Sequence, residues 1–427
     1  MKLLRGIDCR GFLPGIPMKS CFSSLRRIVR GLLFVGLPTA FVASSFAAAT
    51  ASGSGPEVTP GVVYQRVASL PELATEIGAF GTSPESPDGR RIVFVAFEWN
   101  PPKTKGPSSK AGYSKGGLYL CNADLKNPVR LRDITRTRWH DGAMQIWLDG
   151  DTLAYMDYLP EKGCYGTYVI RSNGDLVFGP MEASVGHGDT PNESVLLIVD
   201  KKKYPNGSSL GRSGLYLYHA GTVKQVVDLE RDLGSLKDRL KSSDAPADWM
   251  IAHAQLSTEG NYISIRLDTG KGLENLVTCR IDGSDVRPFG TKVKPLHQQW
   301  YDDSTIFGHL RGGGADQLKA VRWDRDGKYI QTLTGPGNHM GISPDRKHLV
   351  SETIYETDPV VMRLYRTGII EPLAVLVNVH AGPIWRNGTH MNPAFSRDGK
   401  AVYFNMPVDG IPQAHRIDLS RLIRERK

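Results

Sequence analysis

The stretch His390–Phe404, which reads HMNPAFSRDGKAVYF, decides the fold of this chain. It has a polar head, a Ser-x-Asp-Gly turn that begins at Ser396, and an apolar strand that ends in Val402–Phe404. Asp and Gly suit the tight connection of a β-hairpin, and Val, Tyr and Phe favour strands. The phrase therefore predicts one hairpin, and the fold follows from its recurrence.

Similar phrases recur along the chain, mostly about forty to sixty residues apart, which is the spacing of propeller blades. Three copies keep both a histidine and the turn, and three more are weaker. The copies include His339, His297 and His253 and, among the weaker ones, His187, Ile146 and Ser86. The seven turns predict an all-β fold, a single seven-bladed β-propeller with a short helical insertion.

The limits of the blades follow from the same pattern. The first blade is predicted to start at Ser86, and the strand expected within Gly61–Val67 should pair with the last blade and close the ring. The insertion is Leu229–Lys241, whose leucines recur at helical spacing and predict packing against the blades. Because it directly precedes His253, we expect it near the mouth of the channel that carries the histidines.

The first 49 residues resemble a secretory signal. Three arginines between residues 26 and 30 precede an apolar run from Gly31 to Phe46, which is followed by three alanines. The run is short and contains Pro38, which disfavours a lasting membrane anchor. We expect cleavage of this leader, with either Met1 or Met18 as the start.

Removing the leader changes what the charge implies. The whole chain carries a formal net charge of +9, but the leader holds seven basic residues and one acidic residue, so about +3 remains. Such a weakly basic surface gives no indication of nucleic-acid binding and tolerates an acidic ligand. The predicted plan is a signal peptide at 1–49, a linker at 50–60 and the propeller at 61–427, in a periplasmic or secreted protein.

Histidines recur at the heads of four successive phrases. Equivalent positions in stacked repeats occupy equivalent places around the axis, so these side chains should ring one mouth of the central channel. Converging neutral imidazoles suit a divalent transition metal. The candidates are His253, His297, His339 and His390. His187 belongs to a poorly formed repeat and is expected to be structural.

The phrases that begin at His297, His339 and His390 resemble those of the oligogalacturonate lyase family. The similarity extends from about His253 to the C-terminus, whereas the first three blades match only general propeller repeats, of the kind also seen in TolB-type proteins. The resemblance implies a seven-bladed propeller whose axial histidines hold manganese. It also implies β-elimination on oligogalacturonate or a related uronate oligosaccharide.

Position by position, the resemblance implies a set of metal ligands. His297 matches the histidine of the family's His-x-x-Trp phrase, and His390 matches the first histidine of its His-Pro-His-Pro phrase. Asn392 stands where that phrase has its second histidine, and Asn387 stands where the family has a ligating glutamine. His253 corresponds to the family's histidine near the reacting sugar and is assigned to catalysis.

The sequence leaves the base and the carboxylate clamp open among several arginines. Those that flank His253 are Arg231, Arg239 and Arg266, of which Arg231 and Arg266 are assigned to catalysis. Arg386 and His339 are assigned to the substrate carboxylate. In the implied reaction a base removes the C5 proton of the uronate, and the C4 glycosidic oxygen leaves.

A second function stays open because Asn392 replaces a family histidine. Under this second hypothesis the chain is a non-catalytic, periplasmic TolB-like propeller that binds or scaffolds a protein partner. Propellers host many unrelated functions, so the fold allows it. Metal binding without elimination activity favours the binding role, and absence of metal favours the scaffold.

Overall fold

Antiparallel strands joined by tight turns make up almost all of the regular structure of this chain. The computed structural model describes residues 56–70, 72–99, 114–138, 141–270, 274–290, 294–311, 319–353, 359–380 and 390–425. These residues lie in one compact unit, and none of the helices found in them is long and apolar enough to span a membrane. The signal peptide predicted at 1–49 falls outside them.

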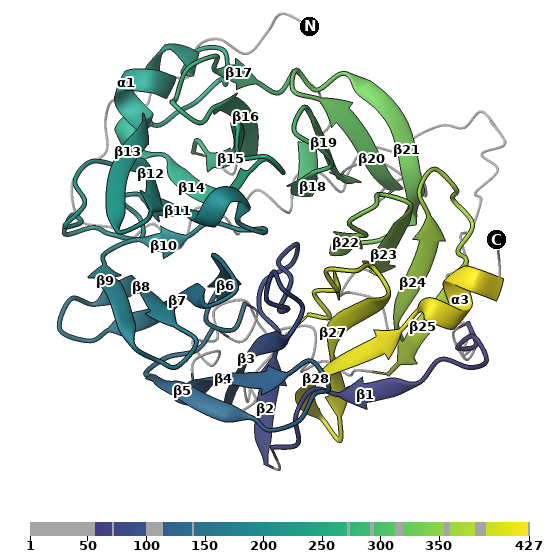
Figure 1. The fold of residues 1–427 in the computed structure, drawn as a ribbon. Coiled ribbons are helices and arrows are strands. Elements are labelled where there is room, and N and C mark those ends of the chain that lie inside the picture. The colour runs from purple at the N-terminus through teal and green to yellow at the C-terminus, as the bar shows by residue number, and fades with distance from the viewer. Residues whose placement is uncertain are drawn as a thin grey trace, which may run out of the picture. The chain divides into compact units, whose positions relative to one another are not determined.

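Seven four-stranded sheets form the blades of a propeller, as the sequence predicted (Figure 1). Blades 1 to 4 contain, in pairing order, β2 (Leu73–Glu76), β3 (Arg91–Glu98), β4 (Gly116–Asn122) and β5 (Val129–Ile134); β6 (Ile146–Trp147), β7 (Thr152–Leu159), β8 (Cys164–Arg171) and β9 (Leu176–Met181); β10 (Ser184–Val185), β11 (Ser194–Val199), β12 (Gly214–His219) and β13 (Thr222–Asp228); and β14 (Met250–Leu256), β15 (Tyr262–Asp268), β16 (Glu274–Arg280) and β17 (Arg287–Pro288). Blades 5 to 7 contain β18 (Lys294–Trp300), β19 (Thr305–Arg311), β20 (Lys319–Asp324) and β21 (Tyr329–Pro336); β22 (Met340–Ile342), β23 (His348–Glu352), β24 (Val360–Arg366) and β25 (Ala374–Val379); and β26 (Ala394–Phe395), β27 (Ala401–Val408), β28 (Ile411–Asp418) and β1 (Tyr64–Arg66).

The first strand of a blade lies toward the axis and the last toward the rim. Figure 1 shows this for β10 and β22 on the inside and for β13 and β21 on the outside. Side chains at the heads of the first strands are therefore brought to the channel.

Blade 7 closes the ring with strands from both ends of the propeller. Tyr64 of β1 pairs with Ile417 of β28, and Arg66 pairs with His415. The predicted closing strand is confirmed. It covers the outer edge of β28, which would otherwise offer unpaired backbone groups to another chain.

The Ser-x-Asp-Gly turns have one hydrogen-bond pattern. In blade 1 the Ser86 hydroxyl donates to Asp88 Oδ1 at 2.6 Å and accepts the Arg91 N–H at 3.0 Å. Gly89 has φ of 71°, the left-handed region that favours glycine. The same serine contacts recur at Ser343 and Ser396. These local bonds explain why the phrase could be recognised in the sequence.

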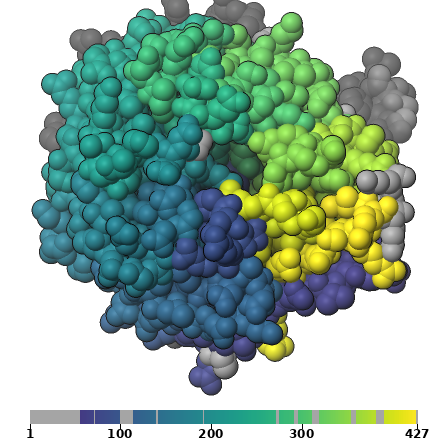
Figure 2. Space-filling model, viewed as in Figure 1, coloured from purple at the N-terminus to yellow at the C-terminus, as the bar shows by residue number. Residues whose placement is uncertain are grey.

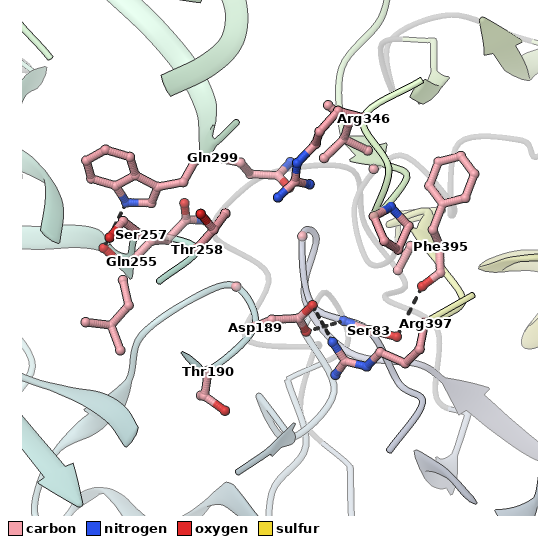
Figure 3. A pocket seen from close by; sticks show the side chains of 18 of the residues that line it. Ser83, Asp189, Thr190, Gln255, Ser257, Thr258, Gln299, Arg346, Phe395 and Arg397 are labelled. Carbon is pink, nitrogen blue, oxygen red and sulfur yellow. Dashed lines mark hydrogen bonds and ion pairs between the residues drawn. The ribbon is translucent and has the colours of Figure 1, made fainter. Parts of the chain in front are cut away.

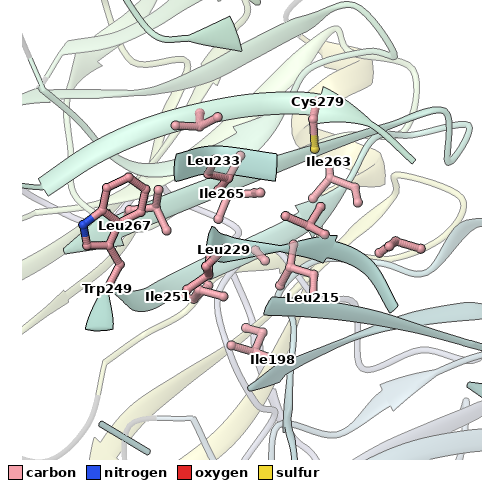
Figure 4. Packing of buried hydrophobic residues seen from close by; sticks show 14 of the residues in the cluster. Ile198, Leu215, Leu229, Leu233, Trp249, Ile251, Ile263, Ile265, Leu267 and Cys279 are labelled. Atoms are coloured by element: carbon pink, nitrogen blue, oxygen red, sulfur yellow. The ribbon is translucent and has the colours of Figure 1, made fainter. Parts of the chain in front are cut away.

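The helical insertion packs between blades 3 and 4, at their outer part. It contains α1 (Leu229–Leu233) and the 3-10 turn η2 (Gly234–Leu236), so the regular helix is shorter than predicted, and a second 3-10 turn, η3 (Pro246–Asp248), follows it. Leu229 and Leu233 pack beside Trp249 in the core of Figure 4, which confirms the packing role of the leucines. However, α1 contacts the outer strand β13, and its expected place near the histidines is wrong.

Two short elements complete the described structure, and one prediction about blade 1 fails. They are η1 (Pro191–Glu193) and α3 (Ser420–Glu425). Blade 1 begins at Leu73, not at Ser86, because β2 forms its inner strand. Between β2 and the bridge of Glu85 with Ile92, the chain leaves the sheet as the segment Ile77–Ser83, here called the plug.

Two histidines away from the channel, the buried His415 and the half-buried His348, should make stability depend on pH. Burial lowers the pKa of His415, whose Nδ1 donates to the Gln413 carbonyl at 2.9 Å, and burial also lowers the pKa of His348. Unfolded histidine takes up its proton near pH 6.5, whereas these folded ones do so only at lower pH. Their stabilisation is therefore complete above about pH 6.5 and is lost as the pH falls through the folded pKa values.

We expect the urea midpoint to fall as the pH is lowered from neutral to mildly acidic values. His415→Gln should flatten that dependence, because the buried titrating group is gone. A midpoint whose pH dependence is the same in the variant as in the wild type would contradict this account.

Candidate functional site

Five histidines from five successive blades meet at the channel axis. The ring centroids of His187 and His253 are 4.2 Å apart, those of His297 and His339 are 4.2 Å apart, and those of His339 and His390 are 4.6 Å apart. The structure thus brings the four predicted histidines together. It adds His187, which the sequence suggested was merely structural. We call these five the histidine ring.

Phe80 of the plug occupies the centre of the histidine ring. Its ring centroid lies 5.1–5.4 Å from four of the imidazoles, and its side chain is 2% exposed. The four are His187, His253, His297 and His339. Blade 1 therefore supplies an aromatic side chain to the axis where later blades supply histidines.

Blade 7 holds the plug in place. Asn392 Nδ2 donates to the Gly78 carbonyl at 3.0 Å, and the Ile77 N–H donates to Asn405 Oδ1 at 3.1 Å. The Ser83 hydroxyl donates to the Phe395 carbonyl at 3.1 Å. Asn392, expected to be a metal ligand, thus uses its amide nitrogen to anchor the plug.

A left-handed backbone conformation turns the side chains of His297 and Asn392 toward the axis. His297 has φ of 47° and Asn392 has φ of 45°, a conformation that costs non-glycine residues free energy and tends to mark functional sites. The pairing of β18 with β19 shifts between Leu296 and Gln299, which is a bulge around His297. Bulges re-aim side chains in this way. A second shift in β14 lies next to His253.

Glu352 joins two histidines of the ring in a cluster that could hold a metal ion. It is 2% exposed, its Oε1 contacts His339 Nδ1 in a short hydrogen bond, and the same oxygen lies 3.8 Å from His390 Nδ1. Its Oε2 accepts the Met391 N–H at 2.8 Å. One donor atom from each of His339, Glu352 and His390 lies within 4.8 Å of the others, and such nitrogen and oxygen donors fit a divalent transition metal.

The electrostatics of the ring keep His297 neutral. Burial lowers its pKa well below 6.5, and the neighbouring histidines and Arg266 lower it further. Arg266 is 9% exposed and lies opposite His253 in the pairing of β14 with β15. A neutral imidazole beside a buried guanidinium suits the binding of an anionic group.

The other predicted site residues divide into two groups. Arg231 lies on α1, where it pairs with Asp232 at 2.6 Å and is 64% exposed, so the structure does not bring it to the histidines. Its proximity to His253 in sequence was misleading, because the intervening chain packs at the outer part of the blades. Arg386 and Asn387 fall outside the described residues.

Sequence reasoning missed Glu352 and Phe80. Glu352 ends the largely buried strand β23, and a carboxylate at a buried strand position is the signal that could have singled it out. Phe80 carries no such signal, since an aromatic residue near a turn usually packs in a core.

Comparison with solved structures supports the fold. An oligogalacturonate lyase in complex with manganese matches with a TM-score of 0.55 at 14% identity, covering 84% of this chain and 93% of that chain. The fold is shared with oligogalacturonate lyases. The lyase from Vibrio parahaemolyticus gives a TM-score of 0.51 at 13% identity, covering 84% of this chain and 97% of its own.

TolB from Acinetobacter baumannii matches more weakly, with a TM-score of 0.40 at 13% identity over 78% of this chain and 81% of that chain. No protein-family model and no curated protein sequence matches the chain. At identities this low the likeness establishes the propeller fold alone, and activity has to be argued from the site.

Proposed function

We propose that this protein is an exported, metal-dependent lyase that acts on a uronate oligosaccharide. The observation that carries the proposal is the convergence of His339, Glu352 and His390 at the channel axis. Manganese is the first metal to test, because a lyase of the same fold binds it and because imidazole and carboxylate donors suit it. The leader predicted at residues 1–49 supports export.

Each residue has a role in the proposed reaction. His339, Glu352 and His390 would hold the ion, which would supply a Lewis acid for the substrate carboxylate. Arg266 would pair with the same carboxylate and so make the C5 proton more acidic. His253, which lies opposite Arg266, would accept that proton on its imidazole, and the C4 glycosidic oxygen would leave.

A second candidate is a propeller that binds its partner without catalysis. Phe80 favours it, because an aromatic ring fills the centre of the histidine ring. In that case the partner is an acidic oligosaccharide or a protein, and the histidines and the plug hold the channel in shape. The two candidates make different predictions once metal is present.

The test uses the protein without its leader. We expect near-stoichiometric divalent metal after loading, and release of unsaturated products from oligogalacturonate, followed by their ultraviolet absorbance. Metal without product over a panel of uronate polymers would support the second candidate. A protein that no divalent ion can load would contradict the lyase. Cell fractionation, with and without residues 1–49, tests export.

A further inference from the structure

A pocket lies at the end of the channel where the Ser-x-Asp-Gly turns gather. Its volume is about 380 Å³, within the range of small-ligand sites. Figure 2 shows the hollow at the centre of the blades, and Figure 3 shows the side chains around the pocket. Its walls are residues that follow the histidines along the inner strands, together with Gly81 and Ser83 of the plug. The pocket contains none of the histidine ring.

Arg346 projects into this pocket from the fourth position of its turn, which is glycine in other blades. The equivalent turn residues Gly89, Gly260 and Gly399 have φ of 71°, 79° and 71°. Arg346 adopts φ of 61°, although that region is unfavourable for a residue with a Cβ atom. Glycine would suit this turn better, so the presence of arginine indicates that its side chain has a function.

The guanidinium of Arg346 is left unpaired. It is half-buried, and no residue of the described ranges forms a hydrogen bond or ion pair with it. Burial lowers its pKa, and the carboxylates of Asp302, Asp189 and Asp345, none of which forms an ion pair with it, offset this only in part. Arg397 in the same pocket differs, because it pairs with Asp189 at 2.7 Å. An unpaired, partly desolvated cation favours an anionic ligand.

A second donor faces the pocket from blade 4. Gln255 is 2% exposed, it lines the pocket, and its Nε2 has no hydrogen-bond partner in the described structure. Figure 3 shows Gln255 and Arg346 on different sides of the pocket. The charged side chains of the lining are Arg346, Arg397 and Asp189, which leave one net positive charge. The pocket therefore offers one free charge and one free amide donor.

We propose that this pocket binds a small hydroxylated carboxylate, with the carboxylate on Arg346 and a hydroxyl oxygen on the Gln255 amide. The planar guanidinium matches a carboxylate in a bidentate contact, and a single net charge balances a single negative charge. Asp189 opposes a more highly charged anion such as phosphate. The site is separate from the histidine ring and does not depend on the proposed lyase activity.

The test is calorimetric titration of the leader-free protein with D-galacturonate and with D-gluconate. Neutral D-galactose, inorganic phosphate and an acidic tetrapeptide serve as comparisons. Each titration is run with and without a chelator, so that binding at a metal in the histidine ring is recognised. We expect saturable binding of at least one of the two carboxylates in the millimolar range or tighter, in both conditions.

Arg346→Gly is the decisive variant, because it restores the residue that suits the turn. We expect it to fold and to melt no earlier than the wild type, while affinity for the carboxylate falls by at least about tenfold. Lys347→Ala is the matched control, since it removes a 76% exposed cation from the same turn and should keep wild-type affinity. Unchanged affinity in Arg346→Gly, no saturable binding of either carboxylate, or equal binding of galactose, phosphate or the peptide would overturn the proposal.

Discussion

Glu352→Gln should abolish both the metal binding and the elimination activity proposed for this protein. Glu352 is the one carboxylate of the metal cluster found in the described residues, and it contacts His339 while lying 3.8 Å from His390. Glutamine keeps the shape and can still accept the Met391 N–H, but it loses the charge that attracts a cation. We expect metal affinity to fall by at least about tenfold. Losses of about tenfold to a hundredfold are typical even when the residue removed only holds a metal ligand in place by a hydrogen bond.

The measurement is metal content after dialysis against a competing chelator, followed by product formation. His348→Gln is the matched control, because His348 begins the same strand, β23, and is not part of the histidine ring. It should keep both metal and activity. If the wild type binds metal and Glu352→Gln binds it equally well, the cluster is not the metal site. Glu352 would then serve only to join blades 6 and 7 through its hydrogen bonds.

Phe80→Ala should destabilise the propeller more than any surface change. Phe80 is 2% exposed and lies against four imidazoles from blades 3 to 6. Truncation of a buried phenylalanine to alanine costs about 3–5 kcal/mol of unfolding free energy, because burial is lost and a cavity remains. The cavity would open at the axis, where the imidazoles lose the surface that fixes their orientation. We therefore expect weaker metal binding as well.

Urea unfolding of the leader-free protein measures the loss of stability. Phe80→Leu, which keeps an apolar side chain in the plug, should lose much less than Phe80→Ala. Tyr329→Ala serves as the surface control, since Tyr329 is 59% exposed and should change stability by no more than about 0.5 kcal/mol. Near wild-type stability of Phe80→Ala would mean that the ring is held by the blades and not by the plug.

The blade plan could be predicted because its signals are local. The Ser-x-Asp-Gly turn is made by hydrogen bonds within six residues, as between Ser86, Asp88 and Arg91, so each turn is visible in a short window of sequence. Repetition of that window gave the seven blades. Position within a repeat also gave the convergence of His253, His297, His339 and His390, because repeats that stack around an axis bring equivalent residues together.

Contacts between unlike parts of the repeats could not be predicted. Glu352 reaches the site from the second strand of blade 6, and Phe80 reaches it from a segment that leaves the sheet of blade 1. His187 joins the ring although its repeat is poorly formed, since its place is set by the neighbouring blades. Arg231 is absent from the ring although it is near His253 in sequence, because the leucines of the insertion draw that segment to the outer part of the blades.

The sequence by itself determined the propeller, its closing strand and the register of four histidines. Tertiary structure alone decided which side chains complete the site. The physical reason is that turns and repeats are fixed by bonds within a short segment, whereas a buried cluster is fixed by which distant segments fill the same space. The plug with Phe80, the carboxylate of Glu352 and the free guanidinium of Arg346 all belong to the second kind.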